Sequence, residues 1–569
     1  MSRRTIIYRG SIKSCNYRCS YCPFSKHPAS AREMERDRAQ WFSFVRRVAE
    51  TGGQSETGAV LVAPYGEALI HPWYWEGLAE LSALPWIDAA GAQTNLSFPE
   101  ELPERFAAFG GAVKKLRLWA TFHPEMTDAA AFADRCRALI RRGVTVCAGA
   151  VGAPGAAEVL RELRRLLPEE CYFWINRMDG MKRTYTEEEK QVFSELDPYF
   201  YRELLCHPAD PAQCAGRLMA EGDGRLRACN ISPVQKERWR HPVSAEGAGR
   251  IPAGVTDAMS KPIESKQLLL PAVCNRKRCS CYLAYGGREN LVNQLLFGPY
   301  PVFRIPRRPK AVFLDIVGTL LLERPDRGGE SERIGVPGCE GENARARLPG
   351  QESERIGVPG CEGENARAGQ SGRYKEPDEE LVTGLRVLRA QGVPLFLATT
   401  LPYREAAKRC QRIWHLFSGG VFSGGAQICM TADEANGRDG TENRSFFYEL
   451  EEEILLALER RKADGYRILK YRNAGRLYKI TLCRAARRPW SAGEAEEICG
   501  DLLLGYRARY LIEGHCLQII SDRADKAAGV RMICSWLGIS PNEAFAAGDS
   551  PEDFGMCALC GYHDSVSER

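Results

Sequence analysis

The sequence predicts an α/β protein with two successive domains, each built on a largely parallel sheet. In the first half, short apolar runs alternate with polar, helix-forming stretches, a pattern typical of strands joined by crossover helices. These runs are residues 58–64, 86–96, 115–122, 144–151 and 171–178. A second series follows, with apolar runs at residues 310–321, 393–400 and 543–553. The change in composition near residue 300 therefore predicts a domain boundary.

The composition excludes several classes of protein. A net charge of +5 over 569 residues is too weak a field to indicate nucleic acid or an anionic membrane as a partner. No stretch approaches the ~20 apolar residues of a membrane span, and the N-terminus lacks the apolar centre of a signal peptide. We therefore expect a cytoplasmic protein. In that reducing compartment, clustered cysteines indicate metal binding and scattered ones indicate burial.

Three cysteines lie close together near the N-terminus, in the sequence "SCNYRCSYCPF". Cys15, Cys19 and Cys22 are able to hold a zinc ion that has a fourth ligand, and His27 is the only close candidate for that ligand. They are equally suited to three irons of a four-iron cluster whose fourth iron stays open to a small molecule. The ligand chemistry alone leaves both alternatives open.

The C-x3-C-x2-C spacing, with Tyr21 before the third cysteine, follows the apolar strand "RTIIYRG" and resembles the radical S-adenosylmethionine (radical SAM) superfamily. The resemblance implies a partial (β/α) barrel over residues 1–200, with a [4Fe-4S] cluster on the three cysteines. It also implies reductive cleavage of S-adenosyl-L-methionine to a 5′-deoxyadenosyl radical. An electron donor such as flavodoxin or ferredoxin would be a partner. The substrate, a peptide or a small molecule, is not indicated.

Further segments resemble the same superfamily. Gly66 and Glu67 in "APYGEALIHP" would face the methionine amino group, and Thr94 and Asn95 in "AQTNLS" are candidate polar contacts to the cofactor. The segment "WATFHP" ends the fourth strand and would place Thr121 or His123 at the barrel mouth, where α/β barrels keep their chemistry. A structural histidine is the alternative.

A second group of cysteines lies in residues 201–295, which resemble the SPASM or twitch extensions of radical SAM enzymes. The resemblance implies an auxiliary iron-sulfur cluster, and zinc is the alternative because thiolates bind both metals. The expected ligands are Cys214, Cys229, Cys274 and one or both of Cys279 and Cys281.

Residues 296–310 are predicted to form a linker to the second domain. After the first strand of that domain, the sequence "ESERIGVPGCEGENARA" occurs at residues 330–346 and again at 352–368. These copies are rich in Gly, Glu and Arg and poor in large apolar residues, so they have no core to build. We interpret residues 323–373 as a disordered insertion.

The second domain carries four short motifs, which resemble in order those of the haloacid dehalogenase (HAD) superfamily. Asp315 ends the apolar strand in "VFLDIVGTLL", and the later motifs supply Thr399, Lys526, Asp549 and Asp553. The resemblance implies that Asp315 attacks phosphorus, that Thr399 and Lys526 balance the phosphate charge, and that Asp315, Asp549 and Asp553 hold Mg²⁺. This division of labour suits phosphoryl transfer, where positioning and charge neutralisation dominate.

The same resemblance implies a Rossmann-like domain over residues 311–569, with a Cof-type α/β cap at residues 431–515. One position departs from the pattern. HAD phosphatases have a second aspartate two residues after the nucleophile, and this chain has Val317 there. General acid–base help is typically worth ~10²- to 10⁴-fold, so we expect impaired phosphatase activity. Dehalogenase and phosphonatase branches also lack that aspartate.

The sequence therefore predicts a radical SAM enzyme of unknown reaction that carries a HAD-like domain. Two alternatives stay open. In one, the chain is a HAD-type hydrolase or phosphatase with an N-terminal metal-binding module. In the other, it is a non-catalytic iron-sulfur assembly protein.

Overall fold

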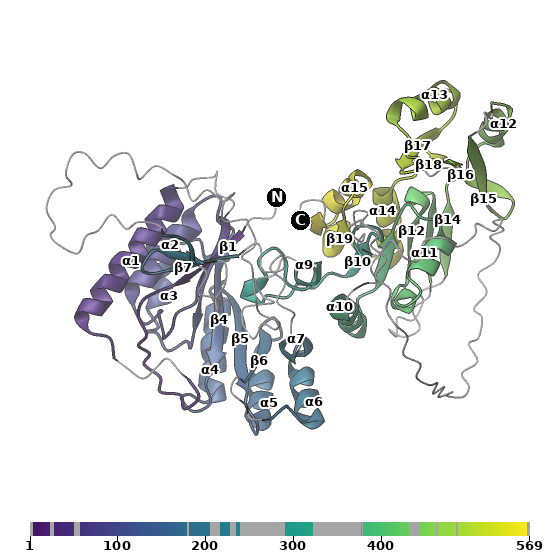
Figure 1. Cartoon of the computed structure of the whole chain (residues 1–569). Coiled ribbons are helices and arrows are strands. Elements are labelled where there is room, and N and C mark those ends of the chain that lie inside the picture. Colours follow the sequence, from purple (N-terminus) through teal and green to yellow (C-terminus); the bar gives the residue numbers. More distant parts are fainter. Residues whose placement is uncertain are drawn as a thin grey trace, which may run out of the picture. The chain divides into compact units, whose positions relative to one another are not determined.

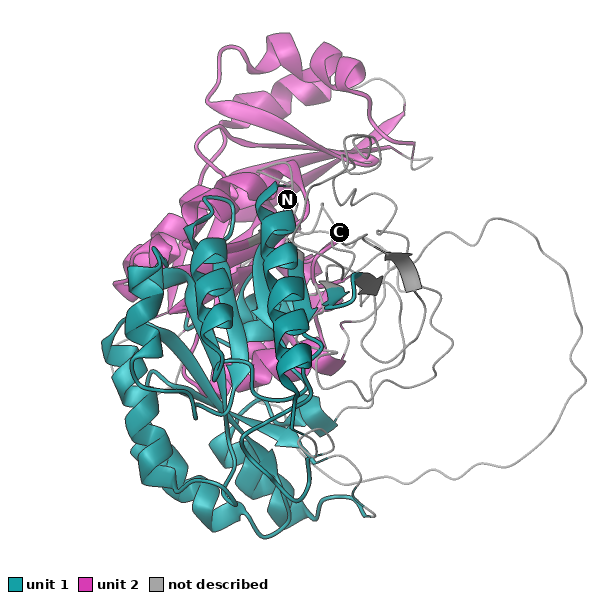
Figure 2. Ribbon diagram, turned by 90° about the vertical axis from the view of Figure 1, so that its left-hand side faces the viewer, with its two compact units in different colours: residues 1–308, 568–569 teal, residues 309–567 magenta. Residues whose placement is uncertain are grey.

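The computed structural model divides the chain into two compact units, residues 1–308 with 568–569 and residues 309–567 (Figures 1 and 2). The boundary falls inside the predicted linker. The structure describes residues 4–22, 28–50, 57–178, 181, 183–204, 217–227, 235–238, 291–321, 377, 379–431, 443–461, 465–484 and 488–565. The predicted zinc ligand His27, the auxiliary-cluster cysteines and the repeat insertion lie outside the described residues. Those cysteines are Cys214, Cys229, Cys274, Cys279 and Cys281.

The first unit is built on a nine-stranded sheet in the order β6-β5-β4-β3-β2-β1-β7-β8-β9. Its strands are β1 (Arg4–Arg9), β2 (Thr57–Val62), β3 (Ala89–Thr94), β4 (Leu116–Phe122), β5 (Thr145–Gly152), β6 (Tyr172–Arg177), β7 (Arg217–Glu221), β8 (Arg225–Arg227) and β9 (Gln235–Arg238). Strands β1 to β6 pair in parallel in chain order, and β7 is parallel to β1. The carboxyl ends of these seven strands therefore meet at one edge.

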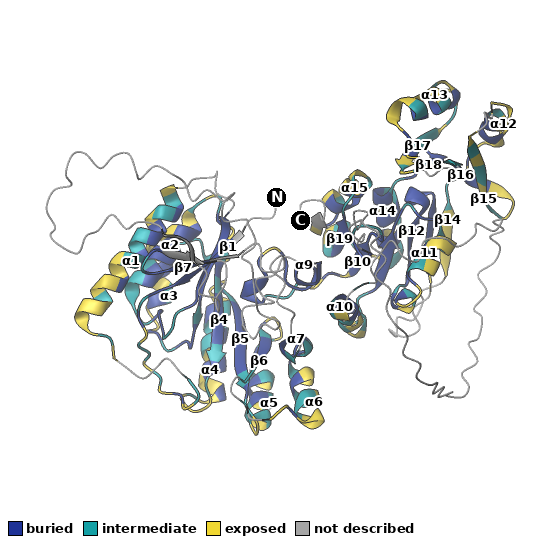
Figure 3. Ribbon diagram, in the orientation of Figure 1, coloured by how far each residue is buried: buried dark blue, intermediate teal, exposed yellow. Residues whose placement is uncertain are grey.

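Helices follow most of these strands, as the alternating pattern predicts. They are α1 (Ala31–Glu50), α2 (Pro72–Ala83), α3 (Leu102–Ala108), α4 (Ala129–Arg141), α5 (Ala157–Leu166), α6 (Glu187–Leu196), α7 (Tyr201–Leu204) and α9 (Leu291–Phe297). Local sequence sets several starts: the Asp128 side chain caps α4, and Thr186 forms a capping box at α6. The helices' apolar sides and alternate strand residues form the main core, which is buried in Figure 3.

The other face of this sheet is covered by residues from the predicted linker. Tyr300, Val302 and Phe303 pack against strand residues such as Leu61 in a second apolar cluster. Arg304 follows in the left-handed region with φ 54° and is 1% exposed. The first part of the predicted linker is therefore core of the first unit, because its apolar run completes the sheet's second face.

Arg304 is held by aromatic rings of the same sheet and by polar groups of β6 and α7. Its guanidinium carbon lies 3.8 Å from the ring centroid of Trp119 and 3.9 Å from that of Trp174. It donates to Asn176 Oδ1 at 2.7 Å and lies 3.7 Å from Glu203 Oε1. These contacts satisfy a buried cation, which would otherwise be costly.

The second unit has a seven-stranded sheet in the order β14-β13-β12-β11-β10-β19-β20. Its strands are β10 (Ala311–Leu314), β11 (Leu395–Ala398), β12 (Gly419–Phe422), β13 (Gln427–Met430), β14 (Arg444–Phe447), β19 (Ala544–Gly548) and β20 (Tyr562–Ser565). Strands β12, β11, β10, β19 and β20 are parallel, and β13 and β14 are antiparallel to their neighbours. The helices are α10 (Glu379–Ala390), α11 (Tyr403–Arg409), α14 (Lys526–Leu537) and α15 (Pro551–Leu559). The predicted Rossmann-like α/β arrangement is present.

A smaller α/β layer, the cap, is inserted between β14 and α14 (Figure 1). Its antiparallel sheet has the order β15-β16-β18-β17, and α12 and α13 share one apolar core with it. The elements are α12 (Glu452–Arg460), β15 (Tyr466–Asn473), β16 (Arg476–Arg484), α13 (Ala492–Leu503), β17 (Ala508–Glu513) and β18 (Cys516–Ser521). The predicted cap ends at residue 515. Strand β18 lies beyond that residue but belongs to the cap sheet, because it pairs with both β16 and β17.

In the described part of the chain, no helix combines the length and the apolar character that crossing a membrane requires.

Candidate functional sites

The carboxyl ends of β10 and β19 bring three aspartates of the second unit together. Asp315 follows β10, and its backbone N–H donates to Ala547 O of β19 at 2.9 Å. Asp549 directly follows β19, and Asp553 lies in the first turn of α15. One carboxylate oxygen from each aspartate lies within 4.8 Å of the other two. Within the described ranges, no other His, Cys, Asp or Glu residues converge in this way.

Lys526, the first residue of α14, lies among these carboxylates. Its Nζ donates to Asp315 Oδ1 at 2.7 Å and to Asp553 Oδ1 at 2.6 Å, and the side chain is 2% exposed. Lys526 is placed by its helix, because Asp525 caps α14 by accepting from Ala528 N. The sequence-predicted residues Asp315, Lys526 and Asp553 thus form one contact group.

The charges of this group leave room for a divalent cation. Three carboxylates against one ammonium leave an excess of two negative charges when all are ionised. Burying uncompensated charge is costly, and converging carboxylate oxygens are the ligands that Mg²⁺ prefers. The donor set of Asp315, Asp549 and Asp553 therefore fits Mg²⁺.

The pKa values reflect this unbalanced charge. Burial raises the pKa of Asp315 to about 7; Lys526 opposes the rise, and Asp553 and Asp549 add to it. Burial alone would lower the pKa of Lys526, but Asp315 and Asp553 raise it above its ordinary value. Burial, followed by the charge of Asp553, raises the pKa of Asp549.

Two glycines leave the space that the acidic side chains occupy. Gly318 has φ +85°, and a Cβ there would lie 1.9 Å from Asp549 Oδ2. At Gly548, a Cβ would lie 2.2 Å from Asp553 Cγ. A side chain at either position would therefore displace a carboxylate.

Hydroxyl groups orient the same two carboxylates. Thr319 Oγ1 donates to Asp549 Oδ1 at 3.3 Å, and Ser550 donates to Asp553 Oδ2 through its N–H at 3.0 Å and its Oγ at 2.6 Å. Ser550 is not among the site residues predicted from the sequence. The signal for it was present, because Ser followed three residues later by Asp is a capping pattern at a helix start.

Thr399 lies after β11, the parallel neighbour of β10, and so at the same edge of the sheet. Its N–H donates to Val421 O at 2.8 Å, its Oγ1 accepts from Leu401 N at 3.2 Å, and the residue is 1% exposed. Val317 is half-buried in the turn after Asp315, where it bridges to Leu321. A valine has no group that transfers a proton, so the position two residues after Asp315 offers no acid or base to the site.

A cap residue that the sequence analysis did not single out reaches this loop. Lys479 of β16 is 1% exposed, and its Nζ donates to Thr400 O at 3.0 Å. Burial lowers the pKa of Lys479 to about 8, against the opposing charge of Glu513. Lys479 gives no signal in the sequence, because its partner is 79 residues away.

The fold and the acidic site of the second unit are similar to those of haloacid dehalogenase-like hydrolases. The family model described as haloacid dehalogenase-like hydrolase matches residues 492–566. The rest of the chain, including the first unit, lies outside this match. A comparison with curated protein sequences finds no match.

Several solved structures resemble the chain over part of its length. A haloacid dehalogenase-like hydrolase from Bacteroides thetaiotaomicron is 14% identical and covers 45% of this chain and 86% of its own, with a TM-score of 0.30. A hypothetical protein from Geobacillus kaustophilus HTA426 is 16% identical over 45% of this chain and 86% of its own, with a TM-score of 0.28. The sucrose-phosphatase from Synechocystis sp. PCC6803, in complex with sucrose and phosphate, is 16% identical over 31% of this chain and 70% of its own, with a TM-score of 0.24.

The first unit holds its own candidate site, in the loop that follows β1. Cys19 is buried, Cys15 and Cys22 are half-buried, and Cys22 N donates to Cys19 O at 3.2 Å. The three sulfur atoms do not converge within 4.8 Å, as ligands of a single ion would. Cluster thiolates bind different iron atoms and need no such convergence. Burial raises the pKa of Cys15 to about 11, so binding a metal has to displace its proton.

Side chains from α1 and α2 anchor the start of this cysteine loop. Asp37 of α1 is fully buried and accepts from Ser11 N at 2.8 Å, Ile12 N at 3.2 Å and Tyr74 OH at 2.7 Å. A buried carboxylate with three donors is well satisfied. The path of the chain out of β1 is therefore fixed before the first cysteine.

The loop after β4 anchors the other end of the cysteine loop. Ser20 donates to Glu125 through its N–H at 2.7 Å and its Oγ at 2.6 Å. Tyr21 OH lies 2.7 Å from His123 Nδ1. Burial lowers the pKa of His123 to about 4, so its ring is neutral at neutral pH and shares one hydrogen bond with the Tyr21 hydroxyl. His123 contacts the segment between Cys19 and Cys22.

The four predicted cofactor residues also meet at this loop. A Cβ at Gly66 would lie 1.7 Å from Ser14 O, so the two backbones approach closely. Glu67 Oε1 accepts from Leu69 N at 3.0 Å and Thr94 Oγ1 at 2.9 Å, and Oε2 accepts from Asn95 N at 2.6 Å. The Glu67 carboxylate thus joins the ends of β2 and β3, and burial raises its pKa to about 7. Asn95 Nδ2 lies 3.7 Å from Cys15 Sγ.

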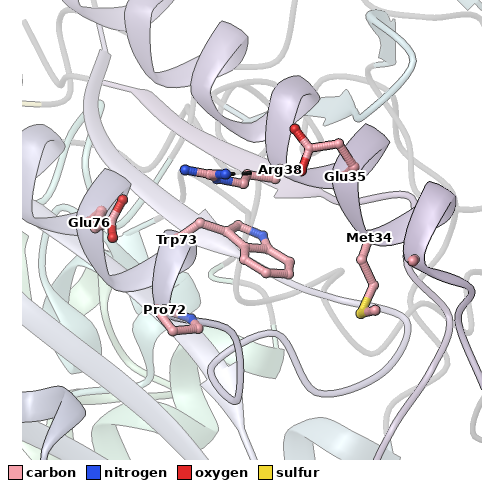
Figure 4. Close-up of a pocket in the computed structure, with 7 residues that line it drawn as sticks. Met34, Glu35, Arg38, Pro72, Trp73 and Glu76 are labelled. Atoms are coloured by element: carbon pink, nitrogen blue, oxygen red, sulfur yellow. Dashed lines mark ion pairs between the residues drawn. The ribbon is translucent and has the colours of Figure 1, made fainter.

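A surface pocket of about 330 Å³ lies elsewhere in the first unit, between α1 and α2 (Figure 4). Met34, Glu35 and Arg38 line one side of it, and Trp73 and Glu76 line the other. None of the sequence-predicted site residues contributes to it.

Proposed function

We propose that the second unit is a Mg²⁺-dependent hydrolase in which Asp315 attacks a phosphoryl group. One observation carries this proposal, the convergence of Asp315, Asp549 and Asp553 around the buried Lys526. When bound by the three aspartates, Mg²⁺ supplies positive charge beside the phosphoryl oxygens. The haloacid dehalogenase-like match over residues 492–566 supports the same class.

The chain's own residues divide the remaining work. The Asp315 carboxylate attacks phosphorus, the bond to the leaving oxygen breaks, and water then cleaves the aspartyl phosphate to return the carboxylate. Lys526 opposes the rise in the pKa of Asp315 and so favours its ionised form, and Thr399 adds a hydroxyl group at the same edge of the sheet. Because Val317 donates no proton, we expect turnover only on esters whose leaving group departs without protonation by the chain.

A phosphatase assay with Mg²⁺ tests this proposal, with p-nitrophenyl phosphate as the substrate, because its leaving group needs no proton. The parent protein should hydrolyse it slowly, and Asp315→Asn should abolish the activity. Val317→Asp should raise the rate on alkyl phosphates by about 10²-fold or more, by supplying the missing acid. Equal rates for the parent and Asp315→Asn would show that the nucleophile is not Asp315.

We further propose that the first unit is a radical SAM enzyme. The support is the arrangement at the carboxyl edge of a sequentially ordered parallel sheet. There, the loop with Cys15, Cys19 and Cys22 meets residues from the ends of β2, β3 and β4. A [4Fe-4S] cluster on these thiols would bind S-adenosylmethionine and, reduced by a flavodoxin or ferredoxin, supply the radical.

The surrounding residues would hold that cluster in place. Asn95 points an N–H at Cys15 Sγ, and hydrogen bonds to cluster sulfurs tune the reduction potential. Ser20 with Glu125, and Tyr21 with His123, hold the loop segment on which Cys19 and Cys22 lie. The same proposal includes an auxiliary iron-sulfur cluster and a substrate that is either a peptide or a small molecule.

Anaerobic reconstitution tests this second proposal. Protein loaded with iron and sulfide and reduced with dithionite should cleave S-adenosylmethionine to 5′-deoxyadenosine, and Cys19→Ala should not. Metal analysis separates the alternatives, because a zinc module would carry zinc without sulfide. A non-catalytic assembly protein would carry iron and sulfide without producing 5′-deoxyadenosine, which would end the proposal.

A further inference from the structure

Two cysteines of the cap face each other across neighbouring antiparallel strands. Cys483 of β16 pairs in register with Cys516 of β18, and their Sγ atoms lie 3.2 Å apart. Arg484 N donates to His515 O at 3.1 Å, so the adjacent pair is hydrogen-bonded and the cysteine pair is not. Non-hydrogen-bonded pairs have Cα atoms about 4.5 Å apart, inside the range that a disulfide spans.

The pair lies on the sheet face that the cap helices leave uncovered. The alternate residues Leu482 and Leu517 belong to the core shared with α12 and α13, so Cys483 and Cys516 point to the opposite face. Both are half-buried, and a small reagent therefore reaches them. Lys479, which donates to Thr400 O near the acidic site, lies on the same face of β16.

A second close pair of cysteines lies in the first unit and is fully buried. Its members are not cross-strand partners, because one lies on α4 and the other precedes β6. Cys136 and Cys171 of the first unit share a hydrogen bond, but both are 0% exposed. Solvent-borne oxidants have no access to them, so they serve as a built-in control for proximity without exposure.

We propose that Cys483 and Cys516 form a redox-active pair, which a hydroperoxide converts into a reversible disulfide within the cap. The Cys483 thiolate attacks the peroxide oxygen, the O–O bond breaks, and a sulfenic acid and an alcohol or water result. The Cys516 sulfur then attacks the sulfenic sulfur and releases water. Two thiols are oxidised by two electrons, the peroxide is reduced, and a dithiol reverses the reaction by exchange.

The surroundings favour Cys483 as the attacking thiol. The hydrogen bond with Cys516 lowers the pKa of Cys483, and burial opposes this effect. The nearby charges of Lys479 and Arg467 also lower it, while Glu405 raises it. Cys516 has the opposite tendency, since its hydrogen bond to Cys483, followed by burial, raises its pKa. The thiolate fraction sets the rate of attack, so the order of the two steps follows.

Peptide mapping of the full-length chain tests the proposal. The protein is treated with one equivalent of hydrogen peroxide, alkylated and digested without reductant. A cross-linked peptide containing Cys483 and Cys516, 2 Da lighter than its two thiol parts, should accumulate at least tenfold faster than oxidation of the half-buried Cys429. Dithiothreitol should remove it, and no cross-link between Cys136 and Cys171 should appear.

Variants keep the result interpretable. Cys516→Ser should leave Cys483 as a sulfenic acid that dimedone traps, and Cys483→Ser should leave Cys516 no more reactive than Cys429. Three outcomes overturn the proposal: no cross-link at a peroxide excess that oxidises Cys429, oxidation of Cys483 to sulfinic acid in the parent without a cross-link, or equal cross-linking of Cys136 to Cys171.

Discussion

The buried carboxylate of Asp315 makes the stability of the second unit depend on pH and on Mg²⁺ together. Its pKa is about 7 in the folded protein, against an ordinary value of 3.8. A carboxyl whose pKa is raised by folding holds a proton that the unfolded chain has already lost. Stability therefore falls as pH rises from 3.8 through 7, and raising the pH from 6 to 8 is the perturbation.

The size of the effect follows from proton occupancy. At pH 6 the folded carboxyl binds about 0.9 proton and at pH 8 about 0.1, while the unfolded chain binds almost none at either pH. Integrated over this range, the loss in free energy of unfolding is about 1.4 kcal/mol, a tenfold change in the unfolding equilibrium. Saturating Mg²⁺ should remove the pH dependence of stability, because the Asp315 carboxylate stays ionised between pH 6 and pH 8 when the metal is bound. Magnesium affinity should itself weaken about tenfold from pH 8 to pH 6.

Hydrogen exchange measured by mass spectrometry is the assay, since it reports each unit separately in the intact chain. Peptides from β10 and α14 should lose about tenfold in protection between pH 6 and pH 8 in EDTA, after correction for intrinsic exchange, and almost nothing with Mg²⁺. Comparison with the matched variant Asp315→Asn removes the contribution that other titrating groups, including Lys479, make to the pH dependence of protection. Equal pH dependence in the parent and in Asp315→Asn, or a Mg²⁺ effect that survives this substitution in full, would refute the reasoning.

Three further predictions concern single residues. Gly318→Ala should abolish the Mg²⁺-induced rise in melting temperature, because its Cβ would occupy the place of Asp549 Oδ2; Gly392→Ala, also at positive φ but with nothing near its Cβ, should retain that rise. Arg304→Met should destabilise the first unit by about 3–5 kcal/mol in urea titrations followed by hydrogen exchange, because it removes a buried cation 3.7 Å from the buried Glu203 carboxylate. The exposed Arg308→Met should change stability by less than about 0.5 kcal/mol in the same titration. Glu125→Gln should weaken cluster binding by about tenfold or more, measured as iron retained after gel filtration, since one of the two Ser20 contacts is lost.

The sequence predicts those features that depend on local pattern. The apolar run at residues 310–321 contains β10, and the aspartate at its end lies where a parallel strand delivers its functional residue. Lys526, Asp549 and Asp553 were expected to act with Asp315, and the topology brings them into contact because β19 is the parallel neighbour of β10. The order of the motifs along the sequence therefore predicted which residues meet at the acidic site of the second unit.

Contacts between distant segments could not be predicted in the same way. The position of Arg304 near Trp119 and Trp174 depends on how residues 300–304 pack on strands far away in the sequence, which no local pattern encodes. The Tyr21 to His123 contact spans 102 residues, and the cap's fourth strand lies beyond the predicted cap because pairing, not composition, assigns it. Strand register and the contacts between distant segments depend on the packing of the whole domain.

The burial of residues 300–304 has a practical consequence for dissecting the protein. A fragment cut at residue 295, where the cysteine-rich segment was expected to end, would lack Val302 and Phe303 and leave Leu61 and Met219 exposed to water. Such an uncovered apolar face favours aggregation. The first unit should be expressed to at least Arg308, and a soluble shorter fragment would show that residues 300–304 are dispensable.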